Sequence, residues 1–346
     1  MFNPKYQITH KILIDISQIE AAKQIIENSP LLPRYERKFK NEAVLRSVHH
    51  STHIEGNRFD IDEAEKIIKG QKSNIKEKDV DFQDIINYRN VLKYIEVLQK
   101  NTLEFKDILK IHGIVSHNLL AEKYCGKLRD RQVVIQNSKT KQISFVPPSH
   151  FEIKELLEDL LLWIGEQKEI SPVIKAGLFH CQFAKIHPFV DGNGRTARAL
   201  TTLVLYLDGF DIKRFFCLDE YYDQDLKGYY KALQSVSDFE QDFTAWLEYF
   251  IGGLKTEFVK IKEKVLKISR DQKIKKTLGQ VYLTERQEKI VEYLQEIGRL
   301  QNKDFVRILP DVSEDTVLRD LKDLIKKKVV RKKGKTKAAY YELRDK

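Results

Sequence analysis

One short segment constrains the fold of this chain most: residues 187–198 read His-Pro-Phe-Val-Asp-Gly-Asn-Gly-Arg-Thr-Ala-Arg. Residues 172–186 precede it with few charges, and residues 196–207 follow it as a second apolar stretch. The apolar spacing of both flanks is typical of core helices, so the segment must be a tight connection between them. Two glycines around an asparagine suit such a connection, because glycine adopts backbone conformations that other residues avoid.

The same connection carries groups that bind phosphate. Gly192, Asn193 and Gly194 stand where the second helix begins, and backbone N–H groups at a helix N-terminus favour an anion. Arg195 and Arg198 are three positions apart on one face of that helix, and their planar guanidinium groups suit two phosphates. The P-loop pattern Gly-x-x-x-x-Gly-Lys-Ser/Thr is absent from the sequence.

A base and a carboxylate accompany these groups. Asp191 offers an oxygen ligand for a hard cation, and Mg²⁺ commonly combines one or two carboxylates with substrate phosphates. His187 lies four positions earlier, near enough to take a proton from an attacking hydroxyl. Each residue alone has an ordinary explanation as a helix cap, a turn or a solvent-facing charge. Their combination favours a polyphosphate site with its own proton acceptor.

The segment resembles the His-x-Phe-x-Asp/Glu-Gly-Asn-Gly-Arg-x-x-Arg signature of Fic (filamentation induced by cAMP) domains, with every defining position present. The resemblance extends over residues 42–250. It implies a mainly α-helical core with a small β-hairpin flap. It also implies transfer of AMP from ATP to a Ser, Thr or Tyr hydroxyl of a target protein, or of the protein itself, with release of pyrophosphate.

The resemblance assigns a role to each residue of the signature. His187 is expected to be the general base, and Asp191 to hold Mg²⁺ or Mn²⁺. Residues 192–194 are expected to form the anion hole. Arg195 is expected to help position the phosphates, and Arg198 to pair with the γ-phosphate of ATP.

Two further contacts follow from the resemblance. Residues 132–135 and 143–146 predict a β-hairpin, and the hairpin at 132–146 corresponds to the flap that holds the target backbone as an added strand. Tyr230 and Leu233 are candidate contacts for the adenine, with aromatic core packing as the alternative.

An inhibitory motif precedes the catalytic one. Residues 51–56, Ser-Thr-His-Ile-Glu-Gly, match the family pattern Ser/Thr-x-x-x-Glu-Gly/Asn. Ser51 and Glu55 are i,i+4 on a helix expected at about 41–56 that Gly56 ends. The resemblance implies that Glu55 forms a bidentate pair with Arg198 and occupies the guanidinium group that the γ-phosphate needs. The same glutamate could instead position a water that removes AMP, and the sequence leaves this direction open.

Three histidines lie beside this motif. His49, His50 and His53 lack a standard zinc spacing and have no cysteine nearby, so we interpret them as structural.

Helical spacing predicts a mainly α-helical body, with helices over residues 41–54, 60–70, 81–99, 104–120, 151–166, 172–186, 196–207, 224–235 and 240–254. Three short helices followed by two strands then predict a winged helix-turn-helix. The expected domains are an N-terminal helical region (1–105), the Fic core (106–254), a basic linker helix (255–280) and the winged helix-turn-helix-like domain (281–346).

The net charge of +10 is concentrated in the last third of the chain. Residues 255–280 alone carry nine Lys/Arg against three acids, which suggests DNA or a solvated helix face. Acids in the predicted recognition helix, residues 313–328, oppose contact with phosphates. A DNA-binding regulator is therefore the alternative to the enzyme. Target docking or homodimer formation is another role for this domain.

Several classes of protein are disfavoured. No run of eighteen apolar residues is present, and the first residues have no apolar signal region, so we expect neither a membrane span nor secretion. The three cysteines are an odd number without metal-ligand spacing, which favours reduced thiols and a cytoplasmic location. A small-molecule hydrolase is disfavoured because no nucleophile triad is evident.

Overall fold

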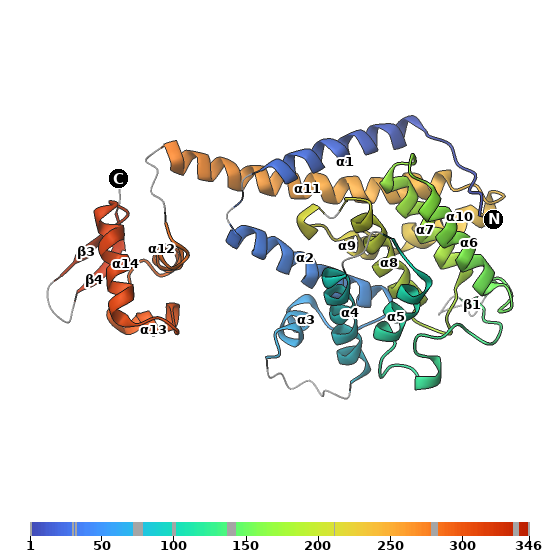
Figure 1. The fold of residues 1–346 in the computed structure, drawn as a ribbon, viewed down its shortest axis with the longest axis horizontal. Coiled ribbons are helices and arrows are strands. Elements are labelled where there is room, and N and C mark those ends of the chain that lie inside the picture. The colour runs from blue at the N-terminus through green and yellow to red at the C-terminus, as the bar shows by residue number, and fades with distance from the viewer. Residues whose placement is uncertain are drawn as a thin grey trace. The chain divides into compact units, whose positions relative to one another are not determined.

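The computed structural model divides into two compact units, Met1–Ile268 and Ser269–Lys346 (Figure 1). It describes residues 2–29, 31, 33–71, 79–98, 102–136, 143–210, 212–277, 283–334 and 339–344. Both units are mainly helical, as expected. No helix within these ranges combines the length and the apolar character needed to cross a membrane.

The first unit contains ten helices within its described residues, the greater part of an eleventh, and one hairpin. They are α1 (His10–Asn28), α2 (Pro33–Ile54), α3 (Ile61–Ile68), α4 (Val80–Val97), α5 (Phe105–Val115), β1 (Ile135–Gln136), β2 (Ile143–Phe145), α6 (Ile153–Glu166), α7 (Pro172–Ile186), α8 (Asn193–Leu207), α9 (Leu218–Gln224), α10 (Leu226–Asp238) and α11 (Thr244–Thr277).

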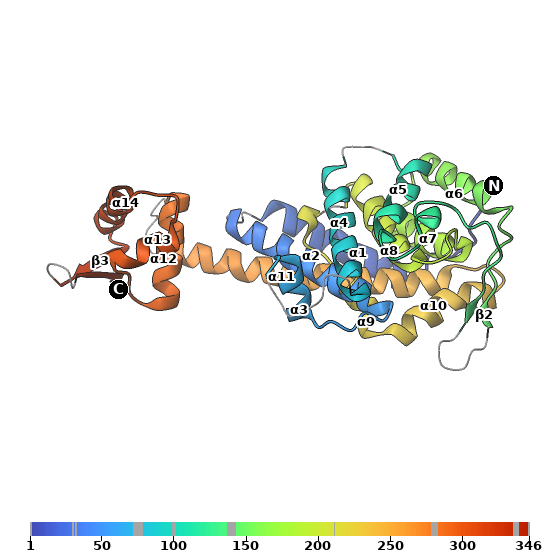
Figure 2. The same ribbon diagram turned by 90° about the horizontal axis from the view of Figure 1, so that it is seen from below.

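The core of this unit is built around α7 and α8, which pack against each other and are covered by α2, α4, α5 and α6 (Figure 2). Pro172 occupies the first turn of α7, where its missing N–H costs nothing, so the predicted helix and the observed one coincide. Phe179 and Phe183 of α7 and Leu200 of α8 are fully buried. The connection between these two helices is thereby fixed at both ends.

The inhibitory motif lies at the end of α2. This helix begins at Pro33, earlier than the residue 41 that we predicted, because Pro33 starts a helix here and does not break one. The predicted end is confirmed: α2 stops at Ile54, and Gly56 follows with a φ of +99°. The helix packs against α4 and against α9, a short helix that the sequence reading did not predict.

The helix α11 is continuous where we expected a core helix and a separate linker helix. Phe258, Ile261 and Val265 continue the apolar stripe of its first half and are buried in the first unit. We did not recognise this stripe from the sequence because lysines stand between its members. Long basic side chains can lie alongside apolar surface while their charges stay in water.

The predicted hairpin is present in a shorter form. β1 and β2 pair antiparallel, with Ile135 opposite Phe145 and Gln136 opposite Ile143. The first predicted strand therefore begins at Ile135, later than the residue 132 that we expected. Residues 137–142 of the predicted hairpin lie outside the described residues.

The second unit has a small core of its own. Its elements are α12 (Glu285–Ile297), α13 (Phe305–Ile308), α14 (Glu314–Lys326), β3 (Val330–Lys333) and β4 (Tyr340–Leu343). Ile290 of α12, Leu321 of α14 and Val330 of β3 are buried against one another. Because β3 and β4 pair antiparallel after three helices, the predicted winged helix-turn-helix arrangement is confirmed.

We predict that Ile261→Ala lowers the free energy of unfolding of the first unit by about 2–5 kcal/mol, because it leaves a cavity in the core. Urea titration followed by tryptophan fluorescence reports this unit, which contains both tryptophans, Trp163 and Trp246. The control Glu263→Ala, on an exposed position of the same helix, should change the value by less than about 0.5 kcal/mol. Equal effects would mean that this stretch of α11 is not part of the core.

Candidate active site

The connection between α7 and α8 is a loop with left-handed backbone at both ends. His187 caps α7 with φ 50° and ψ 60°, and its N–H donates to the Phe183 carbonyl oxygen at 3.1 Å. Gly192 precedes α8 with φ 77°. A histidine in this conformation is uncommon, and such residues concentrate where surrounding contacts and function require them.

The Asn193 side chain fastens this loop. Its Oδ1 accepts the Phe189 N–H and its Nδ2 donates to the Phe189 carbonyl oxygen, both at 2.9 Å. Phe189 itself is fully buried. From the sequence we assigned Asn193 to the anion hole. In the structure, its side chain instead makes the two hydrogen bonds to Phe189. An anion would therefore bind to the backbone N–H groups at the start of α8.

The His187 imidazole is arranged as a proton acceptor. Its Nδ1 lies 3.3 Å from the Ala184 carbonyl oxygen, a contact that a protonated Nδ1 makes by donating. The neutral ring then keeps its lone pair on Nε2. Burial lowers the pKa of His187, although the Ala184 contact opposes this, so the neutral form prevails near neutral pH.

His112 of α5 packs against the loop and holds it in place. We did not identify this residue from the sequence. Its ring stacks on Phe189 with centroids 3.6 Å apart. Its Nε2 donates to the Asp191 carbonyl oxygen at 2.9 Å, while its Nδ1 accepts the Gly126 N–H at 3.0 Å. These partners specify one neutral tautomer, and burial lowers the pKa of His112 to about 4.

Arg129 is a second positioning residue that the sequence reading missed. Its Nε donates to the His187 carbonyl oxygen at 2.9 Å, and its Nη2 donates to the Pro148 carbonyl oxygen at 2.6 Å. Its backbone N–H donates to the Pro188 carbonyl oxygen. Because Pro148 follows β2, this buried guanidinium joins the base of the hairpin to the residue expected to be the general base.

Arg198 lies where the inhibitory motif meets the loop. Its Nε donates to Ser51 Oγ at 2.8 Å, and its Nη2 donates to the Ser51 carbonyl oxygen at 2.7 Å and to Glu55 Oε1 at 2.8 Å. Asp219 of α9 is 3.4 Å from its Nε. Burial opposes the charge, but these acids outweigh it and raise the pKa of Arg198.

The Glu55 carboxylate lies against the start of α8. A Cβ added to Gly194 would collide with Glu55 Oε1, so only glycine leaves room for this carboxylate. The carboxylate therefore occupies space beside the backbone N–H groups that we expect to bind phosphate. Glu55 reaches Arg198 through a single oxygen in the structure, whereas we expected a bidentate pair.

The remaining site residues are placed as follows. Arg195 points toward α4 and pairs with Asp84, so in this structure it joins two helices and does not face the loop. Asp191 is exposed, and its Oδ1 accepts the Gly192 N–H at 2.6 Å. Tyr230 of α10 is half-exposed. The pKa of Tyr230 is raised mainly by burial and further by the nearby Glu55. Leu233 of the same helix packs on the core.

Residues 102–205 match the Fic/DOC family, and residues 286–336 match the DeoR-like helix-turn-helix domain. The chain therefore contains a Fic domain followed by a helix-turn-helix domain, as the sequence resemblance implied.

Known proteins similar to the chain agree with this assignment. The protein adenylyltransferase Fic of Drosophila ananassae is 30% identical over 200 residues, which are 56% of this chain and 37% of that protein. The chain thus spans about a third of the length of such curated relatives. A Fic family protein from Desulfovibrio desulfuricans G20 has the same fold, with a TM-score of 0.69 at 21% identity over 100% of this chain and 99% of that one. Fic-1 from C. elegans follows, with a TM-score of 0.59 at 21% identity over 75% and 74%.

We predict that His112→Phe, which keeps the stacked ring, lowers the free energy of unfolding by about 1–3 kcal/mol because Asp191 and Gly126 lose their partner. The deficit should be full above pH 6.5. As the pH falls from 6.5 to about 4, the unfolded chain protonates its histidine first, so the stability supplied by neutral His112 is lost and the deficit shrinks. Urea titrations at several pH values measure this difference.

The exposed His117→Phe serves as the control, with a change expected below about 0.5 kcal/mol. A deficit of the His112 variant that does not vary with pH would contradict the lowered pKa assigned to His112 in the folded chain.

Proposed function

We propose that this chain is a protein adenylyltransferase and that its own helix α2 inhibits it. The observation that carries the proposal is the Glu55 carboxylate, held by Arg198 and seated against Gly194. This carboxylate lies beside a base and at the N-terminus of a helix. It carries the negative charge, and takes the position, that we expect of a nucleotide phosphate. Relatives with the name protein adenylyltransferase support the same reaction.

The reaction is a displacement at the α-phosphorus of ATP. The hydroxyl oxygen of a Ser, Thr or Tyr in the target forms the new bond to phosphorus, while the bond to the oxygen shared with the β-phosphate breaks and pyrophosphate leaves. The hydroxyl proton passes to Nε2 of His187, whose Nδ1 contact and lowered pKa keep that nitrogen free of a proton beforehand. Positioning and charge stabilisation then supply most of the rate.

The phosphates of ATP are held by the start of α8 and by Arg198. Backbone N–H groups at residues 192–194 bind the inner phosphates, and Arg198 takes the γ-phosphate once Glu55 withdraws. Arg195 contributes positive charge from its pair with Asp84. Tyr230 and Leu233, on one face of α10, are the proposed adenine contacts.

Asp191 fits a divalent cation. Its carboxylate is exposed at the mouth of the loop, and one oxygen is already oriented by the Gly192 N–H. Mg²⁺ commonly uses one carboxylate together with substrate phosphates and water, and Mn²⁺ takes the same ligands. When bound, the ion neutralises charge on the phosphates of ATP.

The hairpin is the proposed docking edge for the target. Val134, Ile143 and Val146 are exposed along it, with between 42% and 58% of each residue accessible. An extended target segment could add to this short sheet by main-chain hydrogen bonds. Arg129 links the hairpin to His187 and would keep the docked hydroxyl in register with the base. A segment of the protein itself could dock in the same way.

We predict that Glu55→Gly increases AMP transfer about tenfold or more, whereas His187→Ala abolishes it, because the first change frees Arg198 and the second removes the base. Labelled ATP and autoradiography of the purified chain, with a lysate as the source of targets, measure both. Mass spectrometry of the labelled protein should find the added mass of one AMP.

The matched control is Glu166→Gly, which removes an exposed glutamate from the end of α6 and should leave labelling unchanged. If Glu55→Gly labels no more strongly than the parent chain, the inhibitory role of Glu55 is wrong. If no variant labels any protein, the transferase itself is wrong.

A second candidate function, DNA binding, is favoured by three exposed basic residues on one face of α14. We counted the acids of this helix against DNA contact, but Asp320 is buried and pairs with Arg286, and Asp323 is engaged by Lys327. Arg319, Lys322 and Lys326 are exposed at i, i+3 and i+7, on one face. The match to a DeoR-like helix-turn-helix supports a recognition role for this helix.

We predict salt-dependent binding of duplex DNA that weakens in the double variant Arg319→Gln/Lys322→Gln. Each lost phosphate contact should reduce the slope of log affinity against log salt by about 1. Gel shifts at two salt concentrations measure it, with Lys289→Gln, an exposed position of α12, as the control. Equal affinity of all three proteins would exclude α14 as the DNA-binding helix.

Both functions suit the cytoplasm, in agreement with the free cysteines.

A further inference from the structure

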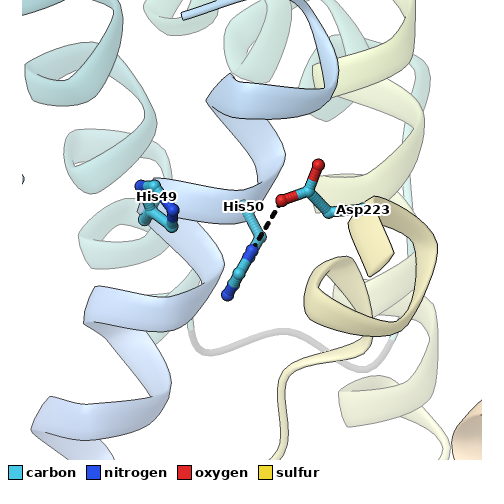
Figure 3. A group of neighbouring side chains, drawn as sticks. All are labelled: His49, His50 and Asp223. Carbon is cyan, nitrogen blue, oxygen red and sulfur yellow. Dashed lines mark hydrogen bonds and ion pairs between the residues drawn. The ribbon is translucent and has the colours of Figure 1, made fainter. Parts of the chain in front are cut away.

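Three histidines on α2 lie near an aspartate of α9, next to the motif at residues 51–56. Figure 3 shows two of them, His49 and His50, together with Asp223. His49 and His53 are one helical turn apart, and His50 lies beside them. Asp223 stands at the end of α9, far away in the sequence. One ligand atom each from His49, His50 and Asp223 lies within 4.8 Å of the other two.

The contacts among these residues already bring ligand atoms together. Asp223 Oδ2 is 2.7 Å from His50 Nδ1, and Asp223 Oδ1 is 2.7 Å from His53 Nδ1. The rings of His49 and His50 have centroids 4.7 Å apart, and those of His49 and His53 are stacked at 5.7 Å. Three imidazoles and a carboxylate therefore converge on one small volume.

From the sequence we interpreted these histidines as structural because their spacing is not a standard zinc pattern and no cysteine lies nearby. The fold supplies a further ligand from α9, and the resulting set of two or three imidazoles and one carboxylate is one that Zn²⁺ prefers. Bonds of about 2.0–2.1 Å in a tetrahedral site place neighbouring ligand atoms about 3.3 Å apart. The ligand atoms of His49, His50 and Asp223 lie within 4.8 Å of one another, so the side chains would have to turn to give that spacing around an ion.

We propose that His49, His50 and Asp223 bind a Zn²⁺-class transition-metal ion that ties α2 to α9. The ion takes the Nδ1 lone pair of the neutral His50 ring, and the proton that Nδ1 donates to Asp223 moves to Nε2 of the same ring. His53 donates to the second Asp223 oxygen and acts as a positioning residue.

The site has a consequence for the inhibitory contact, and this part rests on the proposed function. Ser51 and Glu55 leave α2 from the same two turns as the histidines, and Asp219 leaves α9 one turn before Asp223. All three contact Arg198. An ion that fixes α2 on α9 therefore holds Glu55 in its inhibitory place and lowers AMP transfer.

The first experiment measures binding on the full chain, without any assay of activity. Calorimetry with Zn²⁺, and visible absorption with Co²⁺ as a probe of tetrahedral geometry, should each give one ion per chain. Asp223→Ala and His49→Ala should abolish binding, and His53→Ala should weaken it about 10–100-fold. His10→Ala, an exposed histidine of α1, should bind as the parent does. Tryptophan fluorescence checks that each variant is folded.

Binding that is absent, or that survives both Asp223→Ala and His49→Ala, overturns the site, and the cluster is then a hydrogen-bonded contact only. This result is independent of whether the chain transfers AMP.

The second experiment measures regulation. Zn²⁺ should reduce AMP transfer by the parent chain several-fold, should leave Asp223→Ala unaffected, and should bind Glu55→Gly without inhibiting it. Equal inhibition of the parent and Asp223→Ala would place the effect of Zn²⁺ at another site and overturn the regulatory part. Binding of one ion to a chain of which no variant transfers AMP would overturn the proposed function and leave the metal site standing.

Discussion

The structure of the first unit depends on one buried cation. The Arg198 side chain is 2% exposed, and a guanidinium in that position must have anions and acceptors around it. Ser51, Glu55 and Asp219 provide them from α2 and α9. Helix α2 is thus part of the electrostatic support of Arg198. Under the proposed function, activation requires another anion to take the place of Glu55, and a nucleotide phosphate carries that charge.

The loop between α7 and α8 is held in place mostly by residues that lie outside it. Asn193 closes it from within, while His112 holds it from α5 and Arg129 holds it from the base of the hairpin. A base must be aligned with its substrate to within fractions of an ångström, and backbone contacts of this kind provide that alignment. The left-handed conformation of His187 is maintained by the same contacts.

Local patterns allowed much of this to be predicted. The span of α7 followed from Pro172 and apolar spacing, and the contact between Glu55 and Arg198 followed from two motifs with a known relation. What could not be predicted is non-local. No local rule indicates that Asp84 is the partner of Arg195, nor that a buried His112 supports the loop. The short helix α9 escaped prediction because seven residues hold too few turns to show a period.

Under the proposed function, the close approach of Glu55 to Gly194 also limits how the protein can acquire constitutive activity by mutation. A side chain at position 194 would displace the glutamate, but it would fill the space of the phosphate as well. Loss of Arg198 would release α2 and remove the γ-phosphate contact together. Gain-of-function alleles should therefore be confined to a small target centred on residue 55, whereas loss-of-function alleles can arise throughout the loop.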